Sequence, residues 1–354
     1  MSGVRLFVGT KRGLFVLTSE AAREQWHVSQ PMLAGREVYF VGRDGTDGTI
    51  WATTRHTVWG AHVFVSHDSG TTWDVLPSAP HYADGRGLHA VWCITRAAQS
   101  GTLFAGIEPA GLFCSRDGGS SWQSIPALNE HPTAQTWQPA GEALALHSIH
   151  IHGDRIVCAI SAGGFYRSDD GGSTWRALNR GVRADFLPER YPASGQCVHK
   201  LVVHPANPDR IYQQNHCGVY RSDDGGENWL EITNELPSDY GYALTVDPRD
   251  PDTAFVIPEE SSEMRTTVGG RVRVYRTTDA GSSWQPLGRG LPQQDAYLSI
   301  LREGMDSDTL DPVGEYFGTS GGQLFASRNR GESWRQIAAY LPRIICVRAD
   351  TIAQ

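Results

Sequence analysis

The sequence predicts an all-β protein, a seven-bladed β-propeller, and two observations lead to this prediction. First, the pattern S-x-D-x-G-x-x-W stands unchanged at four places and with one change at two more. Second, short apolar runs separated by Gly- and Asp-rich turns fill the intervals between these copies. Short strands repeated at a period of about fifty residues are typical of propeller blades. The tryptophans that mark the period, 47 to 55 residues apart, are Trp26, Trp73, Trp122, Trp175, Trp229, Trp284 and Trp334.

The repeated pattern is explained as the turn of a β-hairpin. In the copy at 222–229, one apolar run precedes the pattern at 218–221 and another follows it at 229–232. In such a turn the Asp carboxylate accepts hydrogen bonds from backbone N–H groups, and the Gly supplies backbone freedom. The Trp is a large apolar anchor between neighbouring sheets. Because near-identical copies cannot all form one active site, we assign these Asp residues a structural role.

Each repeat divides into four predicted strands. The third repeat gives 90–95, 103–107, 111–115 and 122–125, the fourth gives 146–152, 156–160, 164–168 and 175–178, and the fifth gives 198–204, 211–214, 219–222 and a strand starting at Trp229. The sixth gives 242–247, 254–257, 272–277 and 284–287. In the seventh repeat, residues 297–302 are the expected inner strand.

The two ends of the chain are predicted to share the first blade. The first repeat opens on what corresponds to a second strand, 4–8, and has no inner strand of its own. The last repeat has a surplus apolar run at 343–349. We expect this run to pair with 4–8 as the inner strand, because closure removes the free sheet edges that invite aggregation. Residues 1–354 then form one seven-bladed domain.

The repeated pattern resembles the Asp-box, also called the BNR repeat. The whole chain is similar to the bacterial β-propeller proteins that are loosely labelled sialidase-like or glycosyl hydrolase-like. The resemblance implies a β-propeller but no single function, because sialidases, xyloglucanases, sortilin-type receptors and photosystem assembly factors all carry the repeat. Sialidases resemble six-bladed propellers with an F-R-I-P-like motif, which this sequence lacks. Xyloglucanases of this repeat type resemble two propellers in tandem, of which one fits here.

The composition argues against nucleic acid or an anionic membrane as the main partner. The chain has 31 Lys and Arg against 39 Asp and Glu, a net charge of −8. We expect no signal peptide, because the start lacks a charged region followed by a long apolar core, and no apolar run spans a bilayer. The six cysteines contain no C-x-x-C pair. We therefore expect a cytoplasmic protein with mostly reduced thiols, and the sequence leaves open whether Cys197 and Cys217 pair.

The loops between the second and third strands of the repeats are predicted to form a ligand site on the propeller axis. Strands alternate in direction, so these loops share one face, opposite the Asp-box turns. Their polar residues differ between repeats while the surrounding frame is kept, which is typical of a binding site. The alternative is that they are ordinary solvated loop residues. The predicted substrate-binding residues are Lys11, Arg12, Arg55, Trp59, Gln196, Asn215 and Glu259.

Four histidines and one glutamate on the same face are the predicted catalytic residues. His147 and His199 lie near the start of inner strands, and His56, Glu108 and His216 lie in the loops. Imidazoles and a carboxylate from several blades suit a metal ion, or acid–base chemistry without metal. The predicted metal ligands are His147, His199 and His216, for a divalent ion such as Zn²⁺. The competing explanation is that they are hydrogen-bonded core histidines.

Three classes of function are compatible with the sequence. We expect an enzyme of hydrolase or lyase type that acts on a small-molecule ligand in the axial pocket. The first alternative is a non-catalytic propeller that binds a protein partner. The second is a glycosidase, which needs a carboxylate pair such as Glu108 and Glu259. A buried pocket with polar groups favours the enzyme, and a flat apolar face favours the binding module.

Overall fold

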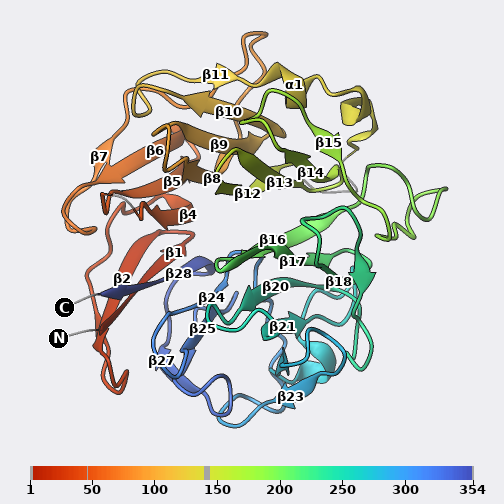
Figure 1. Cartoon of the computed structure of the whole chain (residues 1–354). Coiled ribbons are helices and arrows are strands. Elements are labelled where there is room, and N and C mark those ends of the chain that lie inside the picture. The colour runs from red at the N-terminus through yellow and green to blue at the C-terminus, as the bar shows by residue number, and fades with distance from the viewer. Residues whose placement is uncertain (1–2, 46, 139–143, 353–354) are drawn as a thin grey trace. The chain divides into compact units, whose positions relative to one another are not determined.

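The computed structural model describes residues 3–45, 47–138 and 144–352, and its strands form seven four-stranded sheets (Figure 1). These sheets are the blades of an all-β, seven-bladed propeller, which confirms the predicted fold class. The helical segments are short: α1 (Pro126–Asn129), η1 (Pro132–Thr136) and η2 (Val268–Gly270). Within the described residues, no helix has the length and apolar character needed to cross a membrane.

One compact unit contains residues 3–35, 202–225 and 230–352. Its first sheet has the order β28 (Ile344–Ile352), β1 (Gly3–Thr10), β2 (Gly13–Glu20), β3 (His27–Val28). A second has the order β20 (Gly241–Val246), β21 (Ala254–Pro258), β22 (Val274–Thr277), β23 (Gln285–Leu287). A third has the order β24 (Met305–Ser307), β25 (Glu315–Gly318), β26 (Leu324–Ser327), β27 (Arg335–Ala338). Buried aromatic side chains such as Phe317, Phe325 and Trp334 pack in its core.

The other compact unit contains residues 36–138, 144–201 and 226–229 of the described chain. One sheet has the order β4 (Glu37–Arg43), β5 (Ile50–His56), β6 (Gly60–Ser66), β7 (Asp74–Val75). The next consists of β8 (Ala90–Arg96), β9 (Leu103–Glu108), β10 (Gly111–Ser115) and β11 (Gln123–Ser124). The last has the order β12 (Leu146–His152), β13 (Arg155–Ile160), β14 (Gly164–Ser168), β15 (Arg176–Ala177).

The remaining sheet is the fifth blade along the chain. Its strands are β16 (Val198–His204), β17 (Asn207–Asn215), β18 (Gly218–Ser222) and β19 (Leu230–Glu231), in that order. The boundary between the two units falls inside β16, after Leu201.

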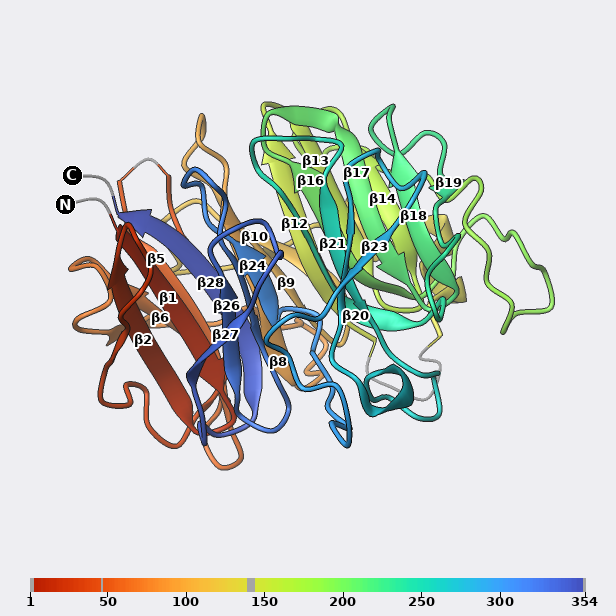
Figure 2. The same ribbon diagram turned by 90° about the horizontal axis from the view of Figure 1, so that it is seen from below.

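The first and last strands of the chain pair in one sheet, where Figures 1 and 2 show β1 beside β28. The pairing is antiparallel, with Val4 opposite Thr351 and Val8 opposite Val347. This confirms the prediction that the C-terminal run completes the first blade. The strand runs on to Ile352 instead of ending at residue 349.

The Asp-box turns are built from side chain–backbone hydrogen bonds, as predicted. Ser168 Oγ donates to Asp170 Oδ1 at 2.8 Å, and Gly172 N donates to Ser168 Oγ at 2.8 Å. Thr174 donates to the same carboxylate through its hydroxyl at 2.6 Å and its backbone N–H at 2.8 Å. Hydrogen bonds from the residue four positions later lower the pKa of Asp170 to about 2, as they do for Asp68 and Asp117.

The prediction that 297–302 forms the inner strand of the seventh repeat is wrong. The inner strand of this sheet is β24. The backbone of 297–302 is used elsewhere: Thr267 N donates to Leu298 O at 2.8 Å, and Ser299 Oγ donates to Arg265 O. The segment therefore braces the long loop 259–273, which follows β21. The pattern of apolar residues alone does not distinguish such a brace from a strand.

Candidate functional site

The predicted cations of the first two blades lie at strand ends. Lys11 and Arg12 form the exposed turn between β1 and β2, where Lys11 N donates to Arg343 O at 3.0 Å and Arg12 N to Thr10 Oγ1 at 3.1 Å. Arg55 is half-buried on β5, opposite Glu37 of β4. Their predicted role in substrate binding stays a prediction.

His56 and Trp59 form an exposed tip between β5 and β6. His56 Nδ1 accepts hydrogen bonds from Val58 N at 3.1 Å and Trp59 N at 3.2 Å, so this nitrogen shapes the turn. The rings of His56 and Trp59 lie 6.3 Å apart, and Trp59 is 67% exposed. An exposed Trp at a loop tip can stack on a ligand.

Glu108 is fixed by two side chains of the same blade. Its Oε1 contacts His89 Nδ1, and its Oε2 accepts from Trp92 Nε1 at 2.8 Å. Glu108 is buried, whereas the side chain of His89 is 41% exposed. A carboxylate that orients an accessible imidazole is the arrangement of a general base. His89 was not among the predicted catalytic residues; its partner Glu108 lies 19 residues later, on the strand that pairs with β8.

His147 is buried on β12 with both ring nitrogens next to protein oxygens. Nε2 lies 2.8 Å from Val198 O, and Nδ1 lies 2.9 Å from Ser148 Oγ. Its neighbour on the strand, His150, places Nε2 at 3.3 Å from Leu201 O. These contacts fit the alternative of a hydrogen-bonded core histidine.

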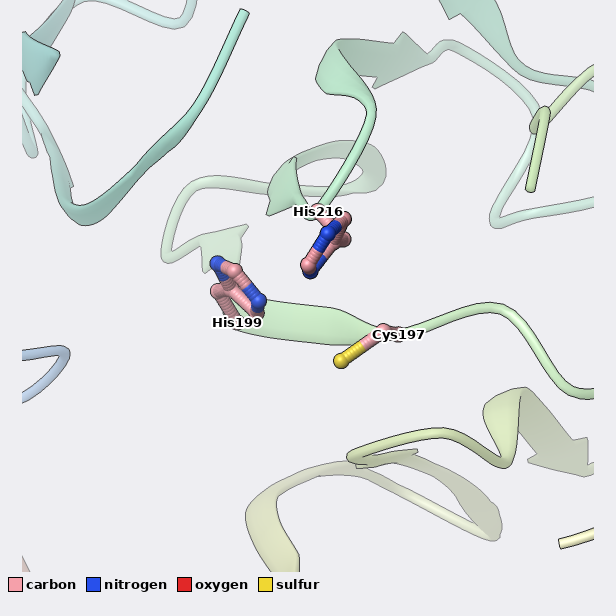
Figure 3. Close-up of side chains that lie close together, drawn as sticks. All are labelled: Cys197, His199 and His216. Atoms are coloured by element: carbon pink, nitrogen blue, oxygen red, sulfur yellow. The ribbon is translucent and has the colours of Figure 1, made fainter. Parts of the chain in front are cut away.

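Figure 3 draws the predicted ligands His199 and His216 together with Cys197. Cys197 and His199 belong to the compact unit that contains residues 144–201, and His216 belongs to the unit that contains residues 202–225. Metal binding by His199 and His216 stays a prediction. His199 is buried, and the ring of His216 packs edge-on against Tyr240 with centroids 5.2 Å apart. Burial lowers the pKa of His216, which keeps the ring neutral at neutral pH.

Gln196 and Asn215 precede Cys197 and His216 in the chain and are fully buried. Gln196 Nε2 donates to Val182 O and Pro192 O, but Gln196 Oε1 has no hydrogen-bond partner. Asn215 Nδ2 is likewise buried without a partner. Buried polar atoms without a partner are rare in folded proteins, so both require an explanation.

Glu259 is a buried carboxyl group at the end of β21. Its Oε1 accepts from Ile300 N at 3.2 Å, and its Oε2 is buried without a partner. Burial raises the pKa of Glu259 to about 7, although the charge of Arg343 opposes the shift. Glu259 therefore exchanges a proton near neutral pH, as a general acid must.

A pocket of about 200 Å³ lies against the loop that follows Glu259. It is lined by Pro237, Pro258, Val268, Gly269, Arg271, Arg273 and Tyr275. Glu260 reaches this lining, because its Oε2 accepts from Gly269 N at 2.7 Å. Guanidinium donors beside an aromatic ring suit a polar ligand that also has an apolar face.

Comparison with known proteins finds similarity to a sortilin-type family and to xyloglucanases. A family model described as Sortilin-Vps10 (sortilin, neurotensin receptor 3) matches residues 163–294, which include the pocket loop. The oligoxyloglucan-reducing end-specific xyloglucanase of Emericella nidulans is 25% identical over 222 residues, which are 54% of this chain and 26% of that protein. The chain thus spans about a quarter of the length of this curated relative.

Solved structures share the fold. The GH74 enzyme of Niastella koreensis matches with a TM-score of 0.63 and 19% identity over 93% of this chain and 51% of that one. YCF48 from Cyanidioschyzon merolae matches with a TM-score of 0.56 and 14% identity over 86% of each chain. At less than 25% identity, these two structures show a shared fold.

Proposed function

We propose that the protein is a glycoside hydrolase that acts on a sugar chain at the pocket beside the loop 259–273. The observation that carries the proposal is the pair Glu259 and Glu260. One carboxyl has a pKa of about 7, and the other contacts a residue that lines the pocket. The relatives supply the substrate class, since their printed names describe xyloglucanases.

Most glycoside hydrolases use two carboxyl groups to cleave a glycosidic bond. One donates a proton to the leaving oxygen, and the other acts as base or nucleophile on the sugar. Glu259 suits the first role because it holds its proton near neutral pH. Glu260 suits the second, because its carboxylate is at the pocket.

Glu259 is fully buried and does not itself line the pocket, whereas its neighbour Pro258 does. The proposal therefore includes a movement of the loop when a sugar chain binds, as is common for active-site loops. The movement would have to break backbone hydrogen bonds of the loop, among them Glu260 N to Thr266 O at 2.7 Å and Thr267 N to Leu298 O at 2.8 Å.

The remaining groups of the pocket suit one sugar ring. Its volume of about 200 Å³ is smaller than the ~300–1,000 Å³ of sites for drug-sized ligands. Arg271 and Arg273 offer donors to hydroxyl oxygens, and the ring of Tyr275 offers a surface for the apolar face of a pyranose. Tyr297, which is 58% exposed and lies beside Gly270, extends this surface.

The test is hydrolysis of xyloglucan oligosaccharides, followed by mass spectrometry of the products. We expect the wild-type chain to cleave them, and Glu259→Gln and Glu260→Gln each to lower kcat/KM at least a hundredfold. Glu263→Gln, an exposed residue of the same loop, is the matched control and should be unchanged. Binding without cleavage by the wild type would instead support the non-catalytic binding module.

A further inference from the structure

We propose that the pocket beside the loop 259–273 takes a sugar residue that carries a carboxylate, a hexuronic acid, and that Arg271 and Arg273 bind this carboxylate. This assignment rests on the proposed function, since it takes the ligand of the pocket to be a sugar, and it adds the chemical class of that sugar. All the residues that carry it lie in the compact unit that contains residues 230–352.

The two arginines and a tyrosine lie on one side of the segment that leads from the loop into β22. In an extended segment, alternate residues point to the same side. Val272 and Val274 are fully buried. Arg271 is exposed, Arg273 and Tyr275 are half-buried, and all three line the pocket. The alternation therefore places two guanidinium groups and one aromatic ring along one wall of the pocket.

The segment beneath the arginines is fixed by hydrogen bonds. Val272 N donates to Pro292 O at 2.9 Å, and Gln293 Nε2 donates to Val272 O at 2.8 Å. Gln293 Oε1 in turn accepts from Arg273 Nε at 3.2 Å. This hydrogen bond orients the guanidinium and does not use its terminal N–H groups. A donor that is oriented in this way loses less side-chain entropy when it binds a ligand.

Both guanidinium groups lack a carboxylate partner. Within residues 3–45, 47–138 and 144–352, neither Arg271 nor Arg273 forms an ion pair. In contrast, Arg276 of the same strand pairs with Glu332 at 2.7 Å. The chain as a whole has a net charge of −8, so an excess of basic residues does not explain unpaired cations in a pocket.

One carboxylate does reach the pocket, that of Glu260, whose Oε2 accepts from Gly269 N at 2.7 Å. Two guanidinium charges against this one carboxylate charge leave an excess of positive charge among the groups that line or reach the pocket. An anionic group on the ligand would neutralise that excess, whereas a neutral sugar would not.

A carboxylate fits the two arginines better than a hydroxyl group does. A hydroxyl oxygen accepts from a guanidinium but leaves its charge uncompensated, whereas a carboxylate accepts two parallel N–H bonds that are charge-assisted. A sulfate ester has the same charge but is larger, because it adds a sulfur and three oxygen atoms where a uronic acid adds one oxygen. In a pocket of about 200 Å³, the smaller anion is the better fit.

The experiment measures binding instead of cleavage, with two ligands that differ at a single carbon, methyl β-glucuronide and methyl β-glucoside. Ligand-observed NMR titrations of the full-length protein give both affinities at low and at high salt. We expect the glucuronide to bind about tenfold more tightly at low salt. High salt should reduce this preference, because it screens the exposed guanidinium of Arg271.

The variants Arg271→Gln and Arg273→Gln should each lower the affinity for the glucuronide about fivefold and affect the glucoside less. Arg273→Lys keeps the charge but loses the paired N–H donors, so its affinity should lie between those of the wild type and Arg273→Gln. Arg289→Gln is the matched control, since Arg289 is an exposed arginine of the same unit outside the pocket lining. Melting temperatures check that each variant is folded.

Several results would overturn the assignment. They are equal affinity of the wild type for the two sugars, no saturable binding of the glucuronide, and a preference that persists when both arginines are replaced by glutamine. Tighter binding of methyl glucoside 6-sulfate than of the glucuronide would also overturn it, because the preferred anion would then be a sulfate.

These results are distinguishable from a failure of the proposed hydrolysis. If the chain cleaves xyloglucan oligosaccharides but binds both methyl glycosides equally, the hydrolase stands and the carboxylate preference is wrong. If the chain prefers the glucuronide through Arg271 and Arg273 but cleaves no xyloglucan oligosaccharide, the carboxylate site stands and the proposed hydrolysis is wrong.

Discussion

The guanidinium of Arg5 donates to the carboxylate of Asp350 at 2.6 Å, across the strands β1 and β28. Both side chains are largely buried, with 12% and 10% exposure. The pair joins the second strand of the first blade to an inner strand that comes from the other end of the chain. Residues Ile344–Ile352 are therefore part of the first sheet.

Deletion of residues from Arg343 onward should lower the melting temperature by roughly 10 °C or more. The deletion removes buried Ile344 and Val347 and exposes the whole edge of β1. Differential scanning calorimetry measures the effect. As the control, a circular permutant begins at Arg343 and continues through a short linker into β1; it should melt close to the wild type, because Gly3 lies opposite Ile352. A truncated chain as stable as the full chain would contradict the role of β28.

Asp68→Ala should destabilise the protein at neutral pH and have little effect near pH 2. Hydrogen bonds from Thr72 lower the pKa of Asp68 from 3.8 to about 2. Since the folded-state pKa is the lower one, the stability from this carboxylate is present above pH 3.8 and is lost as the pH falls toward 2. Melting temperatures from pH 2 to 7 test this, with exposed Asp74→Ala as the control. Equal effects of both variants would refute a structural role for the Asp-box carboxylate.

Glu315→Gln should stabilise the protein in alkaline solution. Glu315 is fully buried on β25, its Oε1 has no partner, and burial raises its pKa well above 4.5, helped by the negative charge of Asp247. Because the folded state holds this proton more tightly, the wild type loses stability as the pH rises above 4.5. Glutamine removes the ionisation.

The free energy of unfolding of Glu315→Gln at pH 8 should exceed that of the wild type by roughly 1–3 kcal/mol, the scale of a buried polar group left unsatisfied. The difference should shrink as the pH falls toward 4.5. Denaturant unfolding at several pH values measures it, and Glu263→Gln on the surface should show no such trend. If the variant is less stable than the wild type at pH 8, ionisation of the buried Glu315 carboxyl does not destabilise the fold and the prediction is wrong.

Sequence patterns were sufficient to predict the blades because each Asp-box turn is local: its Asp bonds residues within four positions. The pairing of β1 with β28 was predictable because a missing strand and a surplus strand complement each other. The seventh inner strand was not, because 297–302 is held by contacts to a loop about thirty residues earlier.

In the candidate sites, too, contacts between residues far apart in the sequence could not be predicted. The strand and turn positions of His199 and His216 predicted them as ligands, but the packing of the His216 ring against Tyr240 depends on the tertiary structure. Glu259 was predicted to bind substrate. Its burial and the lack of a hydrogen-bond partner for its Oε2 depend on the tertiary structure and could not be predicted from the sequence. The His89–Glu108 contact likewise depends on the register of β8 and β9.

Hydrolysis of a xyloglucan oligosaccharide should depend on pH through Glu259. A general acid must carry its proton, and burial raises the pKa of this group to about 7, so kcat/KM should fall as the pH rises above about 7. In Glu259→Gln the remaining activity should lack this alkaline limb. The same group gives a readout on stability: its folded-state pKa lies above the unfolded value of 4.5, so the wild type should lose stability between pH 4.5 and 7 and the variant should not. If the variant loses the stability trend but keeps the alkaline limb of the rate profile, Glu259 is a buried structural carboxyl and another group supplies the proton.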